Sequence, residues 1–171
     1  MRLNHKDLCI REATVGDAEQ LCIWWNDGKV MEHAGFPLGL GTTAEAIAEK
    51  IRKDPGNCRH ILLYREVPIG EMNYRETEPG ICEIGIKICD FSMQNKGLGK
   101  IALSMFLAAL FGTYRKIILD TNLRNERAQH VYEQLGFEKV RVRENSWKDQ
   151  LGNWQSAVDY ELTEEKFRPY L

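Results

Sequence analysis

Three stretches in the middle of the chain carry hydrophobic residues between turn signals, the pattern of strands, and the third of them alternates between two faces. They are CRHILLYRE at 58–66, IGEMNYRE at 69–76 and ICEIGIKIC at 81–89. The segments that join them are short, one at Val67-Pro68 and the other at Glu78-Pro79-Gly80. Because short turns join neighbouring antiparallel strands, this pattern predicts a three-stranded meander.

The residues before the meander predict a strand, a helix and a loop. DLCIREA at 7–13 alternates Leu and Ile with charged residues and is expected to form the first strand. A helix is expected over 14–27, with Thr14 as its N-cap and Asp17 facing back towards it. The stretch at 30–41 is rich in glycine and predicts a loop.

Further elements precede and follow the meander. AEAIAEKIRK at 44–53 is expected to be a helix, opened by a capping box that runs from Thr42 to Glu45. LGKIALSMFLAALFGTY at 98–114 is hydrophobic on nearly all sides, which indicates a buried helix. The remaining predictions are a strand at 116–122 that pairs in parallel, an amphipathic helix at 125–137 ended by Gly136, and two strands at 138–147 and 154–163.

These elements predict an α+β fold in one domain that spans residues 1–171. We expect a mixed, mostly antiparallel central sheet of about seven strands flanked by about four helices. Only one βαβ crossover is visible, whereas a doubly wound dinucleotide-binding fold uses several.

Composition and charge narrow the class of protein. The chain has 43% hydrophobic and 28% charged residues, with a formal net charge of −2. This balance predicts a soluble protein of the cytoplasm that acts on neither nucleic acid nor membranes. The five cysteines include no C-x-x-C pair, and the four histidines lack metal-ligand spacing, so we expect free thiols and no metal.

The stretch QNKGLGKIA at 94–102 carries the chemistry, and it has two interpretations. Gly97, Gly99 and Ala102, with Asp120 further on, fit the fingerprint of a dinucleotide-binding loop. That fold needs the strand to run directly into the first glycine, and here the loop CDFSMQN intervenes. An NAD-dependent enzyme is therefore disfavoured, and the loop is better explained by another phosphate-bearing ligand.

The loop QNKGLG at 94–99 and the helix NERAQHVYEQLGF at 125–137 resemble motifs of the GNAT acyltransferase superfamily. The early helix that ends in WWND and the closing segment DQLGNWQSAVDYELT look most like its ribosomal-protein (Rim-type) and aminoglycoside 6′-type acetyltransferases. QNKGLG is similar to the family's Q/R-x-x-G-x-G/A pyrophosphate loop. NERAQHVYEQLGF matches the helix pattern N-x-x-A-x-x-x-Y-x-x-x-G-F at every position. The resemblance implies an enzyme that transfers an acetyl group from acetyl-CoA, its co-substrate, to a primary amine.

The resemblance also assigns positions to coenzyme A. The glycine loop would bind the pyrophosphate through backbone N–H groups and the start of the next helix, while its lysines either contact phosphate or are simply solvated. The strand before it would bind the thioester and pantetheine through its backbone, and Gly85 suggests a bulge or a close approach. Asn125, or less favourably Asn122, would hydrogen-bond the pantetheine arm. The expected positions are Ile84, Gly85, Ile86, Lys87 and Ile88 in the strand, and Gln94, Asn95, Lys96, Gly97, Leu98, Gly99 and Lys100 in the loop.

Acetyl transfer to an amine needs a base for the ammonium proton and an acid for the departing thiolate. Glu83 is the first candidate for the base, directly or through water, and Glu71 is the second, although a solvent-facing structural role is favoured for Glu71. Tyr132 shares a helix face with Asn125 and is the candidate acid, the role that the family gives this tyrosine.

The acceptor is left open by the sequence. A small-molecule amine and a protein N-terminal amine both fit. The tryptophans near the predicted acceptor pocket could contact a cation or a sugar, although a Trp pair at a helix end is more often part of the core. A non-catalytic module that binds acyl-CoA is the alternative from another functional class. A homodimer is possible, because the closing strands could pair across two chains.

Overall fold

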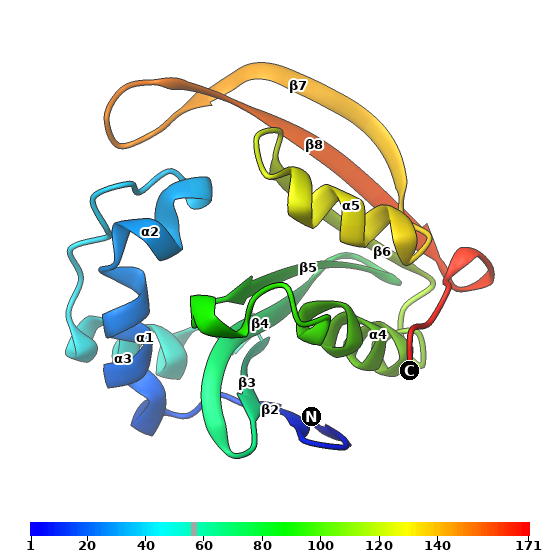
Figure 1. Cartoon of the computed structure of the whole chain (residues 1–171), viewed down its shortest axis with the longest axis horizontal. Coiled ribbons are helices and arrows are strands. Elements are labelled where there is room, and N and C mark those ends of the chain that lie inside the picture. The colour runs from blue at the N-terminus through cyan, green and yellow to red at the C-terminus, as the bar shows by residue number, and fades with distance from the viewer. Residues whose placement is uncertain (56–57) are drawn as a thin grey trace.

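The computed structural model describes residues 1–55 and 58–171. The chain forms one eight-stranded sheet in the order β1-β2-β3-β4-β5-β6-β8-β7. Helices cover the sheet on both faces (Figure 1). The strands are β1 (Arg2–His5), β2 (Leu8–Glu12), β3 (Cys58–Tyr64), β4 (Val67–Glu78), β5 (Ile81–Ile88), β6 (Lys116–Asn122), β7 (Glu138–Lys148) and β8 (Trp154–Thr163). The helices are α1 (Ala18–Trp25), α2 (Gly28–Met31), α3 (Ala44–Lys53), α4 (Leu98–Leu110) and α5 (Glu126–Gln134).

The α+β class and the mixed, mostly antiparallel sheet are confirmed. Among the strands of the described residues, the one parallel pair joins β5 to β6, because α4 connects them as a crossover. Strand β8 lies between β6 and β7 of the same chain, so the closing strands pair internally.

Two hydrophobic cores lie on opposite faces of the sheet. The larger one packs α4, which is buried along most of its length, against the sheet face that carries Met72, Cys82 and Ile84. The smaller one packs α1 and α3 around Ile61 and Leu63 of β3. Alternation along the meander sorts its side chains between these two cores.

Strands β5 and β6 pair over only three residues and then separate. The pairs are Ile81 with Lys116, Cys82 with Ile117, and Glu83 with Ile118. Beyond this point β5 stays paired with β4 up to Ile88, whereas β6 continues along β8. The two halves of the sheet therefore diverge in the middle of the molecule (Figure 1).

Four local predictions need correction. Strand β1 was not expected, and the predicted loop at 30–41 contains the end of α2 and a 3₁₀ turn at Glu32–Ala34. The β3–β4 hairpin turns at Arg65 and Glu66, both with positive φ, while the expected turn residues at 67–68 belong to β4. Helix α3 is capped by Thr43, whose hydroxyl accepts from the Ala46 N–H, so the N-cap lies one residue later than expected and, with Ala46 at N3, the predicted capping box does not form.

The bulge that was expected as one explanation of Gly85 is not found. Strand β5 has no bulge at this glycine, since the register with β4 shifts only between Glu76 and Glu78. A Cβ atom at Gly85 would lie 2.6 Å from Oδ1 of Asn73 on the neighbouring strand. Close approach of a side chain therefore explains the glycine.

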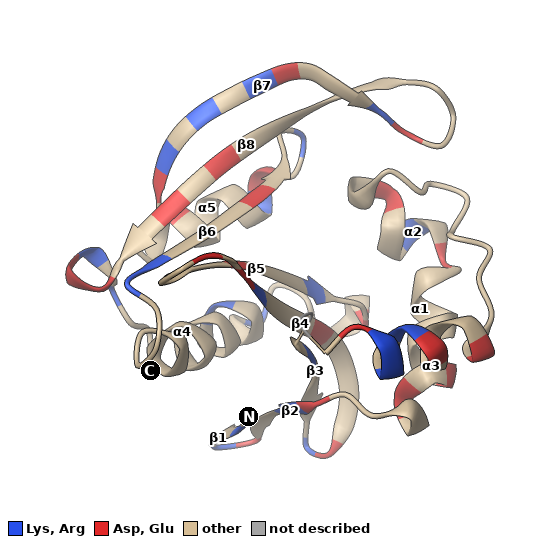
Figure 2. Cartoon of the chain, turned by 180° about the vertical axis from the view of Figure 1, so that it is seen from behind, with Lys and Arg blue, Asp and Glu red and all other residues tan. Residues whose placement is uncertain are grey.

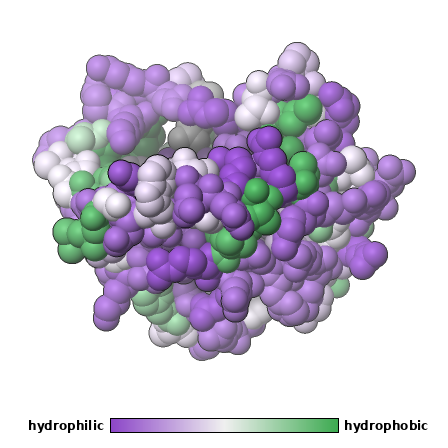
Figure 3. Space-filling view, turned by 90° about the horizontal axis from the view of Figure 1, so that it is seen from above, coloured by the Kyte–Doolittle hydropathy of each residue, from purple (hydrophilic) through white to green (hydrophobic). Residues whose placement is uncertain are grey.

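The face of the molecule seen from above is mostly hydrophilic (Figure 3). Seen from above, hydrophobic side chains occur in small separate groups rather than one broad patch (Figure 3). Strand β7 is an edge strand that is exposed along almost its whole length. Among the described residues, no helix has the length and hydrophobicity that a membrane crossing needs.

Candidate active site

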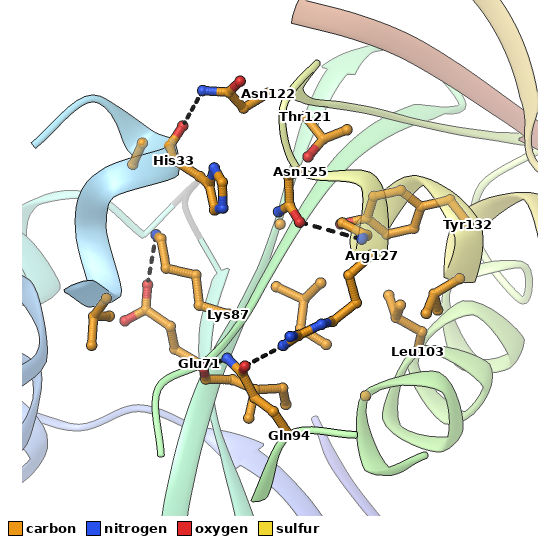
Figure 4. Close-up of a pocket in the computed structure, with 18 of the residues that line it drawn as sticks. His33, Glu71, Lys87, Gln94, Leu103, Thr121, Asn122, Asn125, Arg127 and Tyr132 are labelled. Carbon is orange, nitrogen blue, oxygen red and sulfur yellow. Dashed lines mark hydrogen bonds and ion pairs between the residues drawn. The ribbon is translucent and has the colours of Figure 1, made fainter. Parts of the chain in front are cut away.

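A cavity of about 1160 Å³ opens where β5 and β6 separate. It is lined by β5, β6, the glycine loop, the first half of α4, α5, and the segment of α2 that follows the tryptophan pair. All of the site positions expected from the sequence line this cavity, with the exception of Lys96. Figure 4 shows side chains from α2, β5 and α5 pointing into the same space.

The glycine loop forms the wall next to α4. Gly97 has φ of +75° and is the N-cap of α4, and a Cβ atom there would meet nothing within 4 Å. The first backbone N–H with a partner inside the helix is that of Ile101, which donates to the Gly97 carbonyl at 3.1 Å. The N–H groups of the preceding turn thus face an open space with the positive end of the helix dipole, a good site for phosphate.

Gln94 is fixed by two hydrogen bonds at the entrance to this loop. Its amide nitrogen donates to the Ile88 carbonyl at 3.2 Å, which ties the loop to the end of β5. Its amide oxygen accepts from the guanidinium of Arg127 on α5 (Figure 4). Arg127 therefore brings a positive charge across to the loop, a role that sequence reasoning missed.

The lysines of the loop differ in position. Lys100 lines the cavity, and its ammonium lies 4.1 Å from the ring centroid of Tyr170 in the C-terminal tail. Lys96 does not line the cavity. Arg127 could have been found from the sequence. It lies in the first turn of the helix NERAQHVYEQLGF, and this helix follows β6, the strand that pairs with β5 just before the glycine loop.

The backbone of β5 forms the floor of the cavity. On the side towards β6, residues 84–88 have no strand partner within the described chain, because pairing ends at Glu83. Their N–H and C=O groups on this side can hydrogen-bond a ligand that lies along the strand. This is the arrangement that an extended pantetheine arm with two amides would use.

Glu83 lies at the point where β5 and β6 separate. Partial burial raises the pKa of its carboxyl group above the ordinary value, and the negative charges of Asp120 and Asp159 raise it further. Arg143 lies between these two aspartates, at 3.2 Å from Asp120 and 2.9 Å from Asp159. In Figure 2 this acidic group appears on β6 and β8, with basic positions along β7. The surroundings favour proton uptake by Glu83.

Tyr132 lies across the cavity from this group, on α5. Its ring is buried against Phe137 and Tyr160, with ring centroids 5.7 Å and 5.9 Å away. Burial, and then the charge of Asp120, raise the pKa of its hydroxyl well above 10. The hydroxyl forms no hydrogen bond with the described residues, and the side chain lines the cavity. It therefore stays protonated and can donate a hydrogen bond into the cavity.

The two asparagines have different roles in the fold. Asn125 caps α5 through its side-chain oxygen, which accepts from Ala128 N–H at 3.3 Å, so its NH₂ group is still available for a ligand. Asn122 donates to the His33 carbonyl at 3.3 Å and to Gln155 at 3.1 Å. Because both donors of Asn122 are used within the chain, Asn125 is the better candidate for the pantetheine arm.

Glu71 is buried and not solvent-facing, which corrects the interpretation from sequence. Its carboxylate accepts from the Trp25 indole at 2.8 Å and from Arg59 at 3.1 Å. The ammonium of Lys87 lies 3.5 Å away, at the border of the cavity (Figure 4). The arginine also stacks on the Trp25 ring, 4.8 Å from its centroid. Because donors from three side chains of the protein already surround this buried carboxylate, Glu83 is the better candidate for the base.

The far wall of the cavity comes from α2, the 3₁₀ turn after it, and Trp147 of β7. The Trp147 ring lies over Gly35, where a Cβ atom would be 2.4 Å from the ring. Gln150, in the turn between β7 and β8, accepts from Leu38 N–H and donates to the Gly39 carbonyl, both at 2.9 Å. Trp24 and Trp25 belong to the smaller core, and Trp154 is 57% exposed. The hairpin thus closes the cavity on the side opposite the glycine loop.

The fold and the site define a class of protein, an acyltransferase built around a glycine loop and two diverging strands. The sequence profile described as "Acetyltransferase (GNAT) domain" matches residues 7–138, so the chain belongs to the GNAT acetyltransferase family. A comparison with curated protein sequences gives no match.

Solved structures with the same fold cover nearly the whole chain. The chain is 20% identical to an acetyltransferase of the GNAT family from Bacillus anthracis, with a TM-score of 0.82 over 96% of this chain and 99% of that one. It is 21% identical to spermidine N-acetyltransferase from Vibrio cholerae in complex with CoA and spermine, with a TM-score of 0.82 over 95% and 98%. It is 14% identical to RimL, a ribosomal L7/L12 alpha-N-protein acetyltransferase, in complex with coenzyme A, with a TM-score of 0.83 over 95% and 98%. These similarities establish the fold.

Proposed function

We propose that this protein is an N-acetyltransferase that moves the acetyl group of acetyl-CoA to a primary amine by direct attack on the thioester. The observation that carries the proposal is the cavity at the β5–β6 separation, where Glu83 and Tyr132 face one space beside the glycine loop. A protein that only binds acyl-CoA has no need for an acid and a base at this point.

The residues at the loop fit coenzyme A. Gly97 leaves open space over the start of α4, and the unpaired N–H groups of the first turn can bind the pyrophosphate. Arg127 and Lys100 add positive charge nearby. The free edge of β5 from Ile84 to Ile88 would hold the pantetheine amides and orient the thioester, with Asn125 on the other side.

Glu83 would prepare the acceptor. An alkyl ammonium has a pKa of about 10, so the amine must lose a proton before it can attack. Because its pKa is raised, the Glu83 carboxylate is a stronger base than that of an ordinary glutamate. It acts as a base at any pH at which the carboxyl group is ionised. Its position at the strand separation lets the acceptor approach from the sheet face opposite α4.

Tyr132 would protonate the leaving group. Coenzyme A supplies the activated acyl group, and its sulfur departs as a thiolate that needs a proton or a hydrogen-bond donor. The buried hydroxyl of Tyr132 is protonated at all physiological pH values and points into the cavity. The two groups therefore act from opposite walls, Glu83 on the acceptor side and Tyr132 on the donor side.

The acceptor is a primary amine, either a small molecule or a protein N-terminus. Two of the three similar structures belong to enzymes named for these two kinds of acceptor, a spermidine N-acetyltransferase in complex with CoA and spermine and a ribosomal alpha-N-protein acetyltransferase. The cavity of about 1160 Å³ has room for an acceptor of either class.

A panel of primary amines tests the proposal, with free thiol as the readout and the acetylated product identified by mass spectrometry. We expect thiol release that depends on both acetyl-CoA and one class of amine. Tight binding of acetyl-CoA with no thiol release across small amines, polyamines and peptide N-termini would favour the non-catalytic binding module instead.

A further inference from the structure

The charge of the Glu71 cluster is unbalanced. Glu71 carries one negative charge, while Arg59 and Lys87 both carry a positive one and lie within 3.5 Å of the carboxylate. The Trp25 indole N–H donates a hydrogen bond to the other oxygen of the same carboxylate at 2.8 Å. The cluster therefore has an excess of one positive charge.

Lys87 is the member of this cluster that presents its charge to the cavity. Its side chain is 34% exposed, whereas the side chain of Glu71 is 4% exposed and that of Arg59 is covered by the Trp25 ring. The Arg59–Glu71 pair is also shorter, at 3.1 Å against 3.5 Å. A ligand that enters the cavity meets an ammonium at this place, and the carboxylate lies behind it (Figure 4).

The cavity wall formed by α2 and the 3₁₀ turn after it does not cancel the positive charge of the Glu71 cluster. Lys29 of α2 also lines the cavity and forms no ion pair within the described residues. The acidic residue of this wall, Glu32, is 3.8 Å from His33 and largely exposed at the rim. The acidic groups of the cavity that face the amine, Glu83 and Asp120, are on the other side, at the β5–β6 separation.

We propose that the acceptor carries a carboxylate in addition to its amine, and that this carboxylate binds the ammonium of Lys87. The inference rests on the proposed function and names the substrate class for the same site. Acceptors of this class are peptides with an acidic residue near the N-terminus, or amines that carry a carboxylate at a similar distance. A polyamine would place a second cation against Lys87 and is disfavoured.

The geometry of the strand sets the spacing. If the amine attacks next to the Gly85 backbone, Lys87 lies two residues further along β5. At about 3.3 Å per residue, the backbone positions of Gly85 and Lys87 are roughly 7 Å apart. This is about the distance from the α-amine of a peptide to the side-chain carboxylate of its second residue. The preferred peptide thus has an acidic residue at its second position.

Two dipeptide amides test the inference, both with an N-terminal glycine and one with aspartate, the other with asparagine, as the second residue. Their affinities for the CoA-loaded protein are measured by calorimetry, and their kcat/KM values by thiol release with acetyl-CoA. We expect the aspartate peptide to bind and react about 10-fold better than the asparagine peptide, and spermidine to be the poorest acceptor.

Three variants accompany the test. Lys87→Gln should abolish the preference for aspartate, and Lys87→Arg should retain it, because the charge is retained. Lys53→Gln is the matched control, since Lys53 also pairs with a glutamate, Glu49 at 2.7 Å, but on the exposed surface of α3. Melting temperatures show whether each variant is folded.

The outcomes separate the two proposals. Equal affinity for the two dipeptides, including no measurable binding of either, contradicts the inference about Lys87, and so does an unchanged preference in Lys87→Gln. If the aspartate peptide binds selectively but no amine of the panel is acetylated, the proposed enzymatic function fails while the binding inference stands.

Discussion

Asp120 places a negative charge near both groups to which we assign proton transfer. It raises the pKa of Glu83 and that of Tyr132, which lie on opposite walls of the cavity. Its own charge is partly neutralised by Arg143 at 3.2 Å. Burial is the main cause of both shifts, and the charge of Asp120 adds to them. The carboxylate is thus a stronger base, and the phenol, already protonated at its ordinary pKa of 10, stays so.

The first prediction concerns Tyr132. Tyr132→Phe removes the hydroxyl that donates into the cavity and leaves the packing against Phe137 and Tyr160 in place. We expect kcat to fall about 10²-fold, in line with the loss of a general acid, with the affinity for coenzyme A within about 2-fold of wild type. Steady-state kinetics and calorimetry measure the two values.

Tyr160→Phe is the control for this variant. Tyr160 belongs to the same aromatic group, but its hydroxyl donates to Glu133 at 3.3 Å and not into the cavity. Its kcat should stay close to that of wild type. A similar loss of turnover in both variants would assign Tyr132 to packing.

The second prediction concerns the pH dependence of Glu83. The carboxylate must be ionised to act as a base, so kcat/KM should fall as pH drops through its pKa, which lies above the ordinary 4.5. Glu83→Gln should remove this limb of the pH profile and lower kcat at least about 10²-fold. A variant with the wild-type profile would rule Glu83 out as the base.

Stability provides an independent check on Glu83. A carboxyl group with a raised folded-state pKa favours the folded state below the unfolded pKa, and this contribution is lost as pH rises through the folded-state value. Glu83→Gln is neutral at every pH, so at pH 7 it should unfold at a slightly higher temperature than wild type. The gain should not exceed about 0.5 kcal/mol, because the group is partly exposed and screened. A clear loss of stability would instead indicate a structural role.

At the scale of elements, the sequence was most informative where one face of a strand or helix is buried. Hydrophobic residues between turn signals predicted β3, β4 and β5, which separate the two cores, and the motif in α5 placed Asn125 and Tyr132 on one face. The sequence pattern did not predict β1, because this edge strand has only four residues and a single large aliphatic side chain. It did not predict α2 either, because that helix is too short to show a helical period.

The separation of β5 and β6 is not readable from local sequence. Both strands show continuous patterns, and the separation depends on β8 replacing β5 as the partner of β6. Glu71 was misassigned for a related reason. Alternation gives its face, but the Trp25 indole that covers this face comes from a helix 46 residues earlier in the chain.

The third prediction tests the start of α4. Gly97 has φ of +75°, a conformation that costs other residues about 1 kcal/mol, while a Cβ atom at Gly99 would lie 3.7 Å from Ile88 in ordinary contact. Gly97→Ala should lower the melting temperature by about 3 °C, and Gly99→Ala should leave it unchanged. Both should weaken binding of coenzyme A if the ligand approaches the loop backbone, as thermal melts and calorimetry would show. Unchanged affinity in both variants would place the pyrophosphate elsewhere.

At the scale of the whole molecule, the hairpin of β7 and β8 spans the cavity and reaches the loop after α2. Gln150 connects the two with its side-chain bonds to Leu38 and Gly39, and its own N–H donates to the Gly35 carbonyl at 2.8 Å. The sheet is thereby joined at both ends of the cavity, by the β5–β6 pairing on one side and by this contact on the other. The cavity wall formed by α2, the turn after it and Trp147 is held in place by the contact between the hairpin and this loop.

The fourth prediction follows from this connection. Gln150→Ala removes two hydrogen bonds of about 1 kcal/mol each between the hairpin and the loop. Amides near the hairpin tip should exchange faster with solvent, and KM for the amine should rise while the affinity for coenzyme A stays the same. Leu151→Ala, next to it and 56% exposed, is the control and should change neither. An increase in KM for acetyl-CoA alone would show that the hairpin serves the donor.

The most direct test of the central claim is a single reaction of the wild-type protein with acetyl-CoA and a panel of primary amines, read by mass spectrometry of the acceptors. We predict a product one acetyl group heavier than its acceptor, formed in step with free coenzyme A and lost when either substrate is omitted. Binding of acetyl-CoA without any acetylated amine, over the whole panel, would contradict the account.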